Sequence, residues 1–218
     1  MRKIIAVILL FALLINGCAV TSFSEQQKEE NSNERKTEYE SKEKISKTKE
    51  TDHLDSEETK QYIIPQSLLS VAGITAEELV EDFNSTYSDD YYIDKAEVNE
   101  NGEVLLTLTD TQRKRYMEYK EEVIREEIEN AKDKEDISVE VTDDYKEMKI
   151  FLGENSNSNG FIKTYMMIAT QIGIYQIISG CAPEEWGLHI KVLREGKVIL
   201  DTNEPNASWQ LNNEDFGE

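Results

Sequence analysis

Cysteine, histidine and proline are scarce in this chain of 218 residues, which contains two, two and three of them. Cys18 lies near the N-terminus, so Cys181 is the only thiol in the rest of the chain, and one thiol cannot form an internal disulfide. His53 lies in a strongly polar stretch, which leaves His189 as the only histidine available to a folded region. A histidine-based triad and a multi-histidine metal site are therefore excluded within one chain.

The motifs of common cofactor and catalytic sites are missing as well. The chain has no phosphate-binding loop, no dinucleotide glycine pattern, no Gly-x-Ser-x-Gly and no cysteine pair for zinc. Cys181 follows a predicted helix C-terminus, where the helix dipole disfavours the thiolate that a nucleophile needs. With 33 acidic residues from residue 62 onward, an arbitrary pair of carboxylates carries almost no information. The sequence therefore predicts no catalytic residue and no cofactor.

The N-terminus carries the most specific signal in the chain. Arg2 and Lys3 precede an apolar run over residues 4–15, and this pattern is typical of an export signal. The run is too short for an uncleaved membrane helix, which needs about 20 apolar residues. Leu14-Ile15-Asn16-Gly17-Cys18 resembles the lipobox of bacterial lipoproteins of the Gram-positive type. The resemblance implies cleavage before Cys18 and attachment of diacylglycerol and palmitate to that residue.

Residues 18–61 have almost nothing to bury. From residue 19 onward this stretch holds twelve acidic and eight basic side chains, and isolated apolar residues stand among Glu, Lys, Ser, Thr, Asn and Gln. Such a composition cannot offset the entropy of folding, so we expect a disordered tether after the lipidated cysteine. The tether would average roughly 35–40 Å end to end and extend to about 140 Å. Its regularly placed Lys and Glu could instead form transient helix.

The remaining residues are strongly acidic, with a net charge of −19 from residue 62 onward. Nucleic acid and anionic lipid headgroups should repel such a domain, so membrane association should come from the lipid on Cys18. The acidity either keeps an exported domain soluble or attracts a cationic partner, such as a basic protein, a wall component or a metal ion.

Hydrophobic patterning predicts an α+β domain over residues 62–210. Alternating apolar residues on both sides of Asn101-Gly102, Asp143-Asp144 and Glu195-Gly196 predict three hairpins. Two main helices, over residues 111–132 and 161–179, separate the hairpins, and a short helical segment precedes them. Asp110 is the expected N-cap of the first main helix. We expect one antiparallel sheet of five or six strands packed against both helices, followed by a polar tail over residues 211–218.

One cluster combines acidic and aromatic side chains. Asp89 and Asp90 precede Tyr91 and Tyr92, and Asp94 follows them, ahead of the first hairpin. These residues could bind a cation or stack on a sugar, although the spacing of a calcium loop and its central glycine are missing. The alternative is a turn whose tyrosines pack at the edge of the domain. Whether this region or any other part of the acidic surface holds a metal stays open.

These observations predict a lipid-anchored protein on the extracytoplasmic face of the cell membrane. Without a catalytic pattern, the folded part is expected to be a non-enzymatic binding or interaction module of the cell envelope. Two alternatives remain at this point. One is an enzyme that acts on wall glycan through paired carboxylates, and the other is a small solute-binding lipoprotein.

Overall fold

The computed structural model describes residues 57–86 and 92–216, which belong to one compact unit with an α+β architecture. The described part contains four α-helices and two sheets. The helices are α2 (Gln66–Ala72), α3 (Ala76–Thr86), α4 (Asp110–Glu135) and α5 (Ser158–Ser179), and a 3₁₀ turn, η1, covers Asn213–Phe216. The strands are β1 (Thr59–Ile64), β2 (Lys95–Val98), β3 (Val104–Thr109), β4 (Ile137–Val141), β5 (Glu147–Leu152), β6 (Leu188–Arg194) and β7 (Lys197–Glu204).

The three predicted hairpins are confirmed, and each forms at its predicted turn. Strands β2 and β3, β4 and β5, and β6 and β7 pair antiparallel. Gly102 and Gly196 have positive φ angles of 73° and 76°, which a residue without a Cβ adopts without strain. Local turn chemistry was therefore sufficient to locate these hairpins in the sequence.

The prediction of a single antiparallel sheet is wrong, because the strands form two sheets. The three-stranded sheet has the order β1-β3-β2, and the four-stranded sheet has the order β4-β5-β6-β7. Strands β5 and β6 pair parallel. Helix α5 connects them and returns the chain to the same end of the sheet, which makes the two strands run in the same direction.

Strand β1 was not predicted, and it moves the start of the folded part. It pairs with β3 along its whole length, from Thr59 opposite Thr109 to Ile64 opposite Val104. The boundary expected at residue 62 therefore falls inside a strand. Lys60 and Gln61 lie at the exposed edge of the sheet, so their side chains show no apolar alternation.

Capping residues fix where the helices begin. Thr75 and Glu78 form the predicted capping box at α3, with Glu78 N–H donating to Thr75 Oγ1 at 3.2 Å. The expected cap of α4 is wrong by one residue. Thr109 takes that place and accepts a bond from the Gln112 N–H, while Asp110 is the first helical residue. Asn157 caps α5, which therefore begins three residues earlier than predicted.

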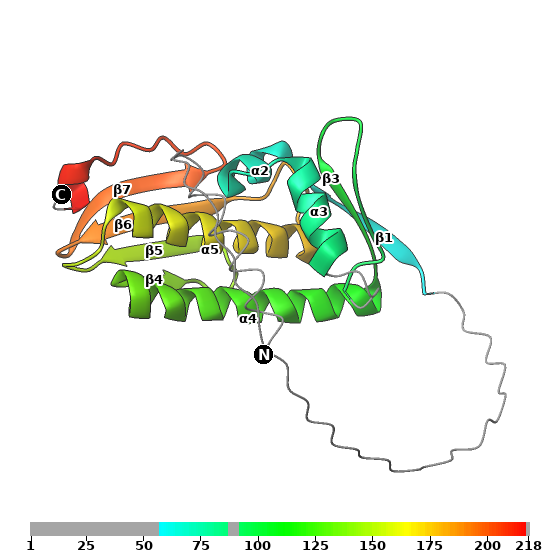
Figure 1. The fold of residues 1–218 in the computed structure, drawn as a ribbon, viewed down its shortest axis with the longest axis horizontal. Coiled ribbons are helices and arrows are strands. Elements are labelled where there is room, and N and C mark those ends of the chain that lie inside the picture. Colours follow the sequence, from blue (N-terminus) through cyan, green and yellow to red (C-terminus); the bar gives the residue numbers. More distant parts are fainter. Residues whose placement is uncertain (1–56, 87–91, 217–218) are drawn as a thin grey trace, which may run out of the picture. The chain divides into compact units, whose positions relative to one another are not determined.

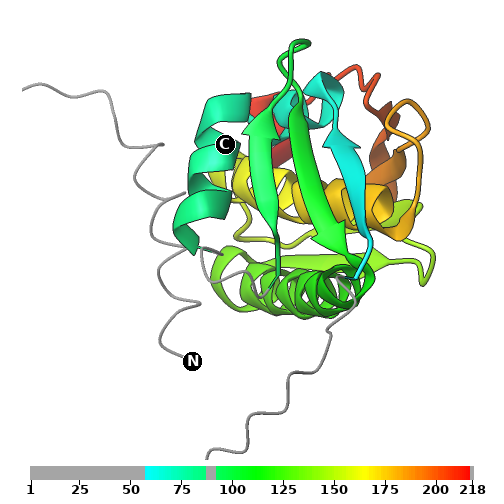
Figure 2. The ribbon, with the colours of Figure 1, turned by 90° about the vertical axis from the view of Figure 1, so that its right-hand side faces the viewer.

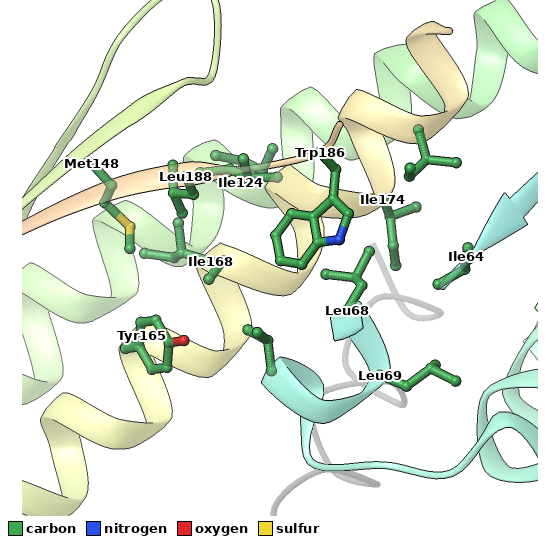
Figure 3. Close-up of a cluster of buried hydrophobic side chains, with 14 of the residues drawn as sticks. Ile64, Leu68, Leu69, Ile124, Met148, Tyr165, Ile168, Ile174, Trp186 and Leu188 are labelled. Atoms are coloured by element: carbon green, nitrogen blue, oxygen red, sulfur yellow. The ribbon is translucent and has the colours of Figure 1, made fainter. Parts of the chain in front are cut away.

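The two long helices form the centre of the domain. Figure 1 shows α4 and α5 running side by side, with the four-stranded sheet next to them. The three-stranded sheet lies at one end of the domain, and Figure 2 shows that end facing the viewer. Buried side chains from both helices, both sheets and α2 form one core, part of which is drawn in Figure 3. Ile168 of α5, Met148 of β5 and Leu188 of β6 are at most 1% exposed. Within the described residues, no helix is long and apolar enough to cross a membrane.

The C-terminal segment is mostly polar in sequence, and its few apolar side chains pack back on the domain. Phe216 of η1 is buried, and Leu211 is partly buried against the core. The Arg194 guanidinium of β6 donates to the Asp215 carbonyl at 3.0 Å. This segment forms one wall of a pocket.

Candidate functional site

A pocket of about 590 Å³ lies between helices α2 and α5, the end of β7 and the C-terminal segment. Its volume is within the range of small-molecule sites. Phe161 and Tyr165 of α5 and Trp209 and Phe216 of the C-terminal segment supply aromatic rings to its lining. We call this space the Glu204 pocket, after the only charged residue among its described lining residues.

Ring contacts hold the C-terminal segment against α5. The centroids of Trp209 and Tyr165 are 4.3 Å apart, and those of Phe216 and Phe161 are 5.5 Å apart. Tilted aromatic pairs at such separations contribute about 0.5–1.5 kcal/mol beyond the area they bury. The wall formed by residues after β7 is therefore fixed to the helix by its own side chains.

Glu204 is the last residue of β7, and its side chain points inward. Leu200 and Glu204 are both buried because side chains alternate between the two faces of a strand. Glu204 is only 6% exposed. The Tyr165 hydroxyl and the Trp209 indole N–H both donate to Oε1 of this carboxylate, the latter at 3.2 Å. Two neutral donors thus hold the acid.

The tyrosine in this pair remains protonated and acts as the donor. Desolvation raises the pKa of Tyr165 far above its ordinary value, and the hydrogen bond to Glu204 raises it further. Both effects disfavour the phenolate, because burial and a nearby acid penalise negative charge. Tyr165 therefore keeps one oxygen of Glu204 occupied, and Oε2 has no hydrogen-bond partner among the described residues.

The rest of the pocket is largely apolar and partly open to solvent. Ile162 is 48% exposed and Trp209 is 37% exposed, and both are large side chains that a folded domain normally covers. Met166 and Leu211 also line this space. Apolar walls with a few well-placed polar groups are typical of pockets that bind amphipathic small molecules.

The described lining of the pocket does not present a hydrolytic arrangement of two acids. Glycoside hydrolysis commonly uses two carboxyl groups about 5–9.5 Å apart across the substrate. Among the described lining residues Glu204 is the only acid, and none of them is Lys, Arg or His. What these residues can supply is a buried carboxylate oxygen, aromatic rings, apolar contact, and the hydroxyl and amide groups of Ser67, Ser70, Ser158 and Asn212.

A second buried charge lies elsewhere, between α4 and α5. Lys120 is 4% exposed, and its ammonium donates to Gln171 Oε1 at 2.7 Å. Its Nζ lies 4.8 Å from the centroid of the Tyr116 ring and 5.6 Å from that of Tyr119. Desolvation lowers the pKa of Lys120 to about 7, and Asp82 opposes this shift. Lys120 lines neither the Glu204 pocket nor the pocket at the turn between β4 and β5.

The outer face of the four-stranded sheet is charged. Glu140, Lys149, Lys191 and Asp201 lie opposite one another on successive strands. His189 Nε2 lies 2.7 Å from Asp201 Oδ1, and the hydrogen bond from His189 is the main cause of the lowered pKa of Asp201. This exposed row can bind polar partners. The same face also carries an apolar row, in which Phe151 of β5, Leu193 of β6 and Val198 of β7 lie opposite one another and Val198 is 53% exposed.

The acidic and aromatic cluster predicted ahead of the first hairpin is only partly described. Asp89, Asp90 and Tyr91 lie outside the described residues, as does Cys18. Tyr92 packs against the Tyr119 ring, with centroids 5.2 Å apart.

Asp94, the last member of that cluster, is exposed, and its backbone N–H donates to the Thr107 carbonyl. Across the described ranges, no three His, Cys, Asp or Glu side chains form a group able to hold a metal ion. Tyr92 therefore contributes to packing against α4.

Sequence reasoning missed the Glu204 pocket. In the sequence, Tyr165 has the spacing of a core residue in the helix predicted over residues 161–179, and Glu204 is one of 33 acidic residues from residue 62 onward. The available signal was an acid four residues after Leu200 on the same face of a strand, followed by Trp209 in an otherwise polar segment. No family model, no curated protein and no solved structure matches this chain.

Proposed function

We propose that this chain is a lipid-anchored binding protein of the extracytoplasmic membrane face, and that it takes a small amphipathic ligand in the Glu204 pocket. The observation that carries the proposal is a buried carboxylate at an open, aromatic-lined cavity of about 590 Å³. Partly exposed Ile162 and Trp209 are available for apolar contact, and Glu204 Oε2 is available for a polar one.

The anchoring part of the proposal rests on the N-terminal sequence. The lipobox-like run ending at Cys18 supports lipidation, and the polar residues up to the first strand support a tether with the reach to cross part of a cell wall. A net charge of −19 from residue 62 onward makes nucleic acid an unfavourable partner and a basic protein or wall component a favourable one.

The pocket favours small-ligand binding over the other two functions considered. A glycan-acting enzyme with paired carboxylates would need a second acid facing Glu204, and the described lining supplies none. Docking of a protein on the outer sheet face would use exposed charges such as Lys191 and Asp201, which contribute little binding free energy. Its apolar contacts there would come from one row of three side chains, Phe151, Leu193 and Val198.

Native mass spectrometry of the full chain purified from its own cells in mild detergent tests ligand binding. We expect a bound small molecule on the wild-type protein, and its loss from a Trp209→Ala variant. Trp209 is chosen because it is partly exposed, so its truncation should leave the core intact. An unliganded wild-type protein, or an equal bound mass on both proteins, would argue against the pocket as a ligand site.

The anchor has its own test. Metabolic labelling with palmitate should modify the wild-type chain, and a Cys18→Ala variant should be unlabelled and either released or left uncleaved. A variant without Cys18 that still matured and stayed at the membrane would exclude the proposed anchor.

A further inference from the structure

We propose that the ligand of the Glu204 pocket is an amphipathic amine, whose ammonium group binds Glu204 and whose apolar part lies on the aromatic walls. The inference rests on the proposed function, since it names the chemical class that the same pocket accepts. It follows from the charge, the rings and the shape of the pocket.

The charge of Glu204 is unbalanced within the domain. Its carboxylate is 6% exposed, and no Lys, Arg or His in the described residues forms an ion pair with it. Tyr165 and Trp209 are neutral donors, and both bind Oε1. A buried carboxylate without a cation is unfavourable, and a charge-assisted hydrogen bond to Oε2 would relieve that cost. A protonated amine supplies such a donor.

Aromatic surface lies beside the carboxylate. The rings of Tyr165 and Trp209 meet Glu204 through donors in their own planes, and both residues line the pocket beside the carboxylate. Phe161 and Phe216 add two further rings to the lining. The apolar part of an amine bound at Oε2 can therefore pack on aromatic side chains.

The pocket offers one charged group and a large apolar surface. Glu204 lies at the end of β7, and Phe161, Ile162 and Met166 line the pocket from α5. A ligand with a charged end and an apolar end can contact both. The acidity of the whole domain raises the local concentration of cations and should repel anionic analogues of the same size.

Three probes that share one apolar group and differ in their head group distinguish the contribution of charge to binding from that of hydrophobic contact. These are 2-phenylethylammonium, 2-phenylethanol and 3-phenylpropionate, each brought to a known free concentration by equilibrium dialysis against the full chain in nonionic detergent at pH 7. Incorporated 5-fluorotryptophan gives two ¹⁹F signals, since the chain has two tryptophans. Trp209 reports on the pocket, and Trp186, at 2% exposed, reports on the core.

We expect the ammonium probe to shift the Trp209 signal at a concentration at least about tenfold lower than the alcohol, and the carboxylate probe to bind most weakly. Glu204→Gln should bring the ammonium probe to the level of the alcohol. Glu140→Gln, at an exposed position on the outer sheet face, makes the same change in net charge and should leave all three affinities unchanged. An unaltered Trp186 signal in each variant shows that the fold is retained.

The outcomes distinguish this inference from the proposed function. Equal affinity for the three probes, with a shifted Trp209 signal, would overturn the preference for a cation and leave the pocket as a binding site. Stronger binding of 3-phenylpropionate would also overturn it. No shift of the Trp209 signal with any probe would count against both proposals.

Discussion

Lys120 and Glu204 are buried to nearly the same extent, at 4% and 6% exposed, but their surroundings differ. The Lys120 ammonium is enclosed between α4 and α5, with Gln171 as its acceptor and two tyrosine rings beside it. The Glu204 carboxylate lies at the wall of an open pocket, with both described donors on one oxygen. The Lys120 ammonium therefore has its partners inside the domain, whereas the Glu204 carboxylate can accept a hydrogen bond from a ligand in the pocket.

This difference indicates what each residue does. A buried charge whose partners all come from the domain acts chiefly on the stability of the fold. A buried charge at a cavity can exchange solvent for a ligand and so contribute to binding. The same physical cost of burying a charge thus supports a structural role for Lys120 and a ligand-binding role for Glu204.

The largest effect is expected from the pH dependence of stability at Lys120. Its pKa is about 7 in the folded protein and about 10.4 in an unfolded chain. The unfolded state therefore binds the proton more tightly, so the contribution of Lys120 to stability rises with pH, by about 2 kcal/mol between pH 7 and pH 9.

Lys120→Met should remove this rise while conserving the apolar stem. Chemical denaturation at pH 7, 8 and 9 gives the free energy of unfolding of the wild-type protein and of the variant. The contributions of the other titrating groups largely cancel in the difference between the two proteins. Parallel stability curves for the two proteins would show that the Lys120 ammonium is not enclosed between the helices.

Glu204→Leu should have the next largest effect and lower the free energy of unfolding by about 1–3 kcal/mol. It leaves the Tyr165 hydroxyl and the Trp209 N–H facing an apolar side chain, and unpaired buried donors are costly. Glu204→Gln keeps an acceptor oxygen at this position and should cost less. Thermal unfolding of the two variants at the same pH measures the difference, and equal losses would mean that these hydrogen bonds do not matter.

Tyr165→Phe should destabilise the protein by about 1 kcal/mol, because it removes one of the two donors to Glu204 and retains the ring. The ring still contacts Trp209, so the C-terminal segment should stay in place. Urea unfolding gives the change in stability, and the ¹⁹F signal of Trp209 reports on the segment. A loss several times larger would indicate that the hydroxyl, not the ring contact, holds this segment.

A partly exposed charge provides the smallest effect. Lys163 of α5 lies 3.1 Å from Glu135 at the end of α4, and its side chain is 43% exposed. Solvent screens such a pair, so Lys163→Met should change stability by less than about 1 kcal/mol, and addition of salt should reduce even that. A loss comparable to that of Glu204→Leu would show that burial does not separate the strong interactions of this domain from the weak ones.

Local features of the fold were predictable from the sequence, and pairings between distant segments were not. Asn101-Gly102 and Glu195-Gly196 specify turns within a few residues, so the hairpins could be located. The parallel pairing of β5 with β6 depends on how α5 returns the chain, which no short pattern encodes. Strand β1 forms because it pairs with β3, which is distant in the sequence. Half of the residues of β1 are polar, so its sequence alone does not indicate a strand.

The site was harder to predict than the fold, because its parts come from separate segments. Tyr165 has the pattern of a core residue, and Trp209 stands alone in a polar stretch. Glu204 is distinguishable from the other acids only through its register opposite Leu188, which places its side chain on the buried face. Only the packing of the C-terminal segment on α5 brings the three side chains together.

The most direct test of the contrast between the two buried charges is the dissociation constant of 2-phenylethylammonium. It is measured for the wild-type full chain and for the variants Glu204→Gln and Lys120→Met. We predict that Glu204→Gln weakens binding about tenfold or more, and that Lys120→Met leaves it within about twofold. Equal changes in both variants, or an unchanged constant in Glu204→Gln, would contradict the assignment of the open charge to binding and the enclosed charge to stability.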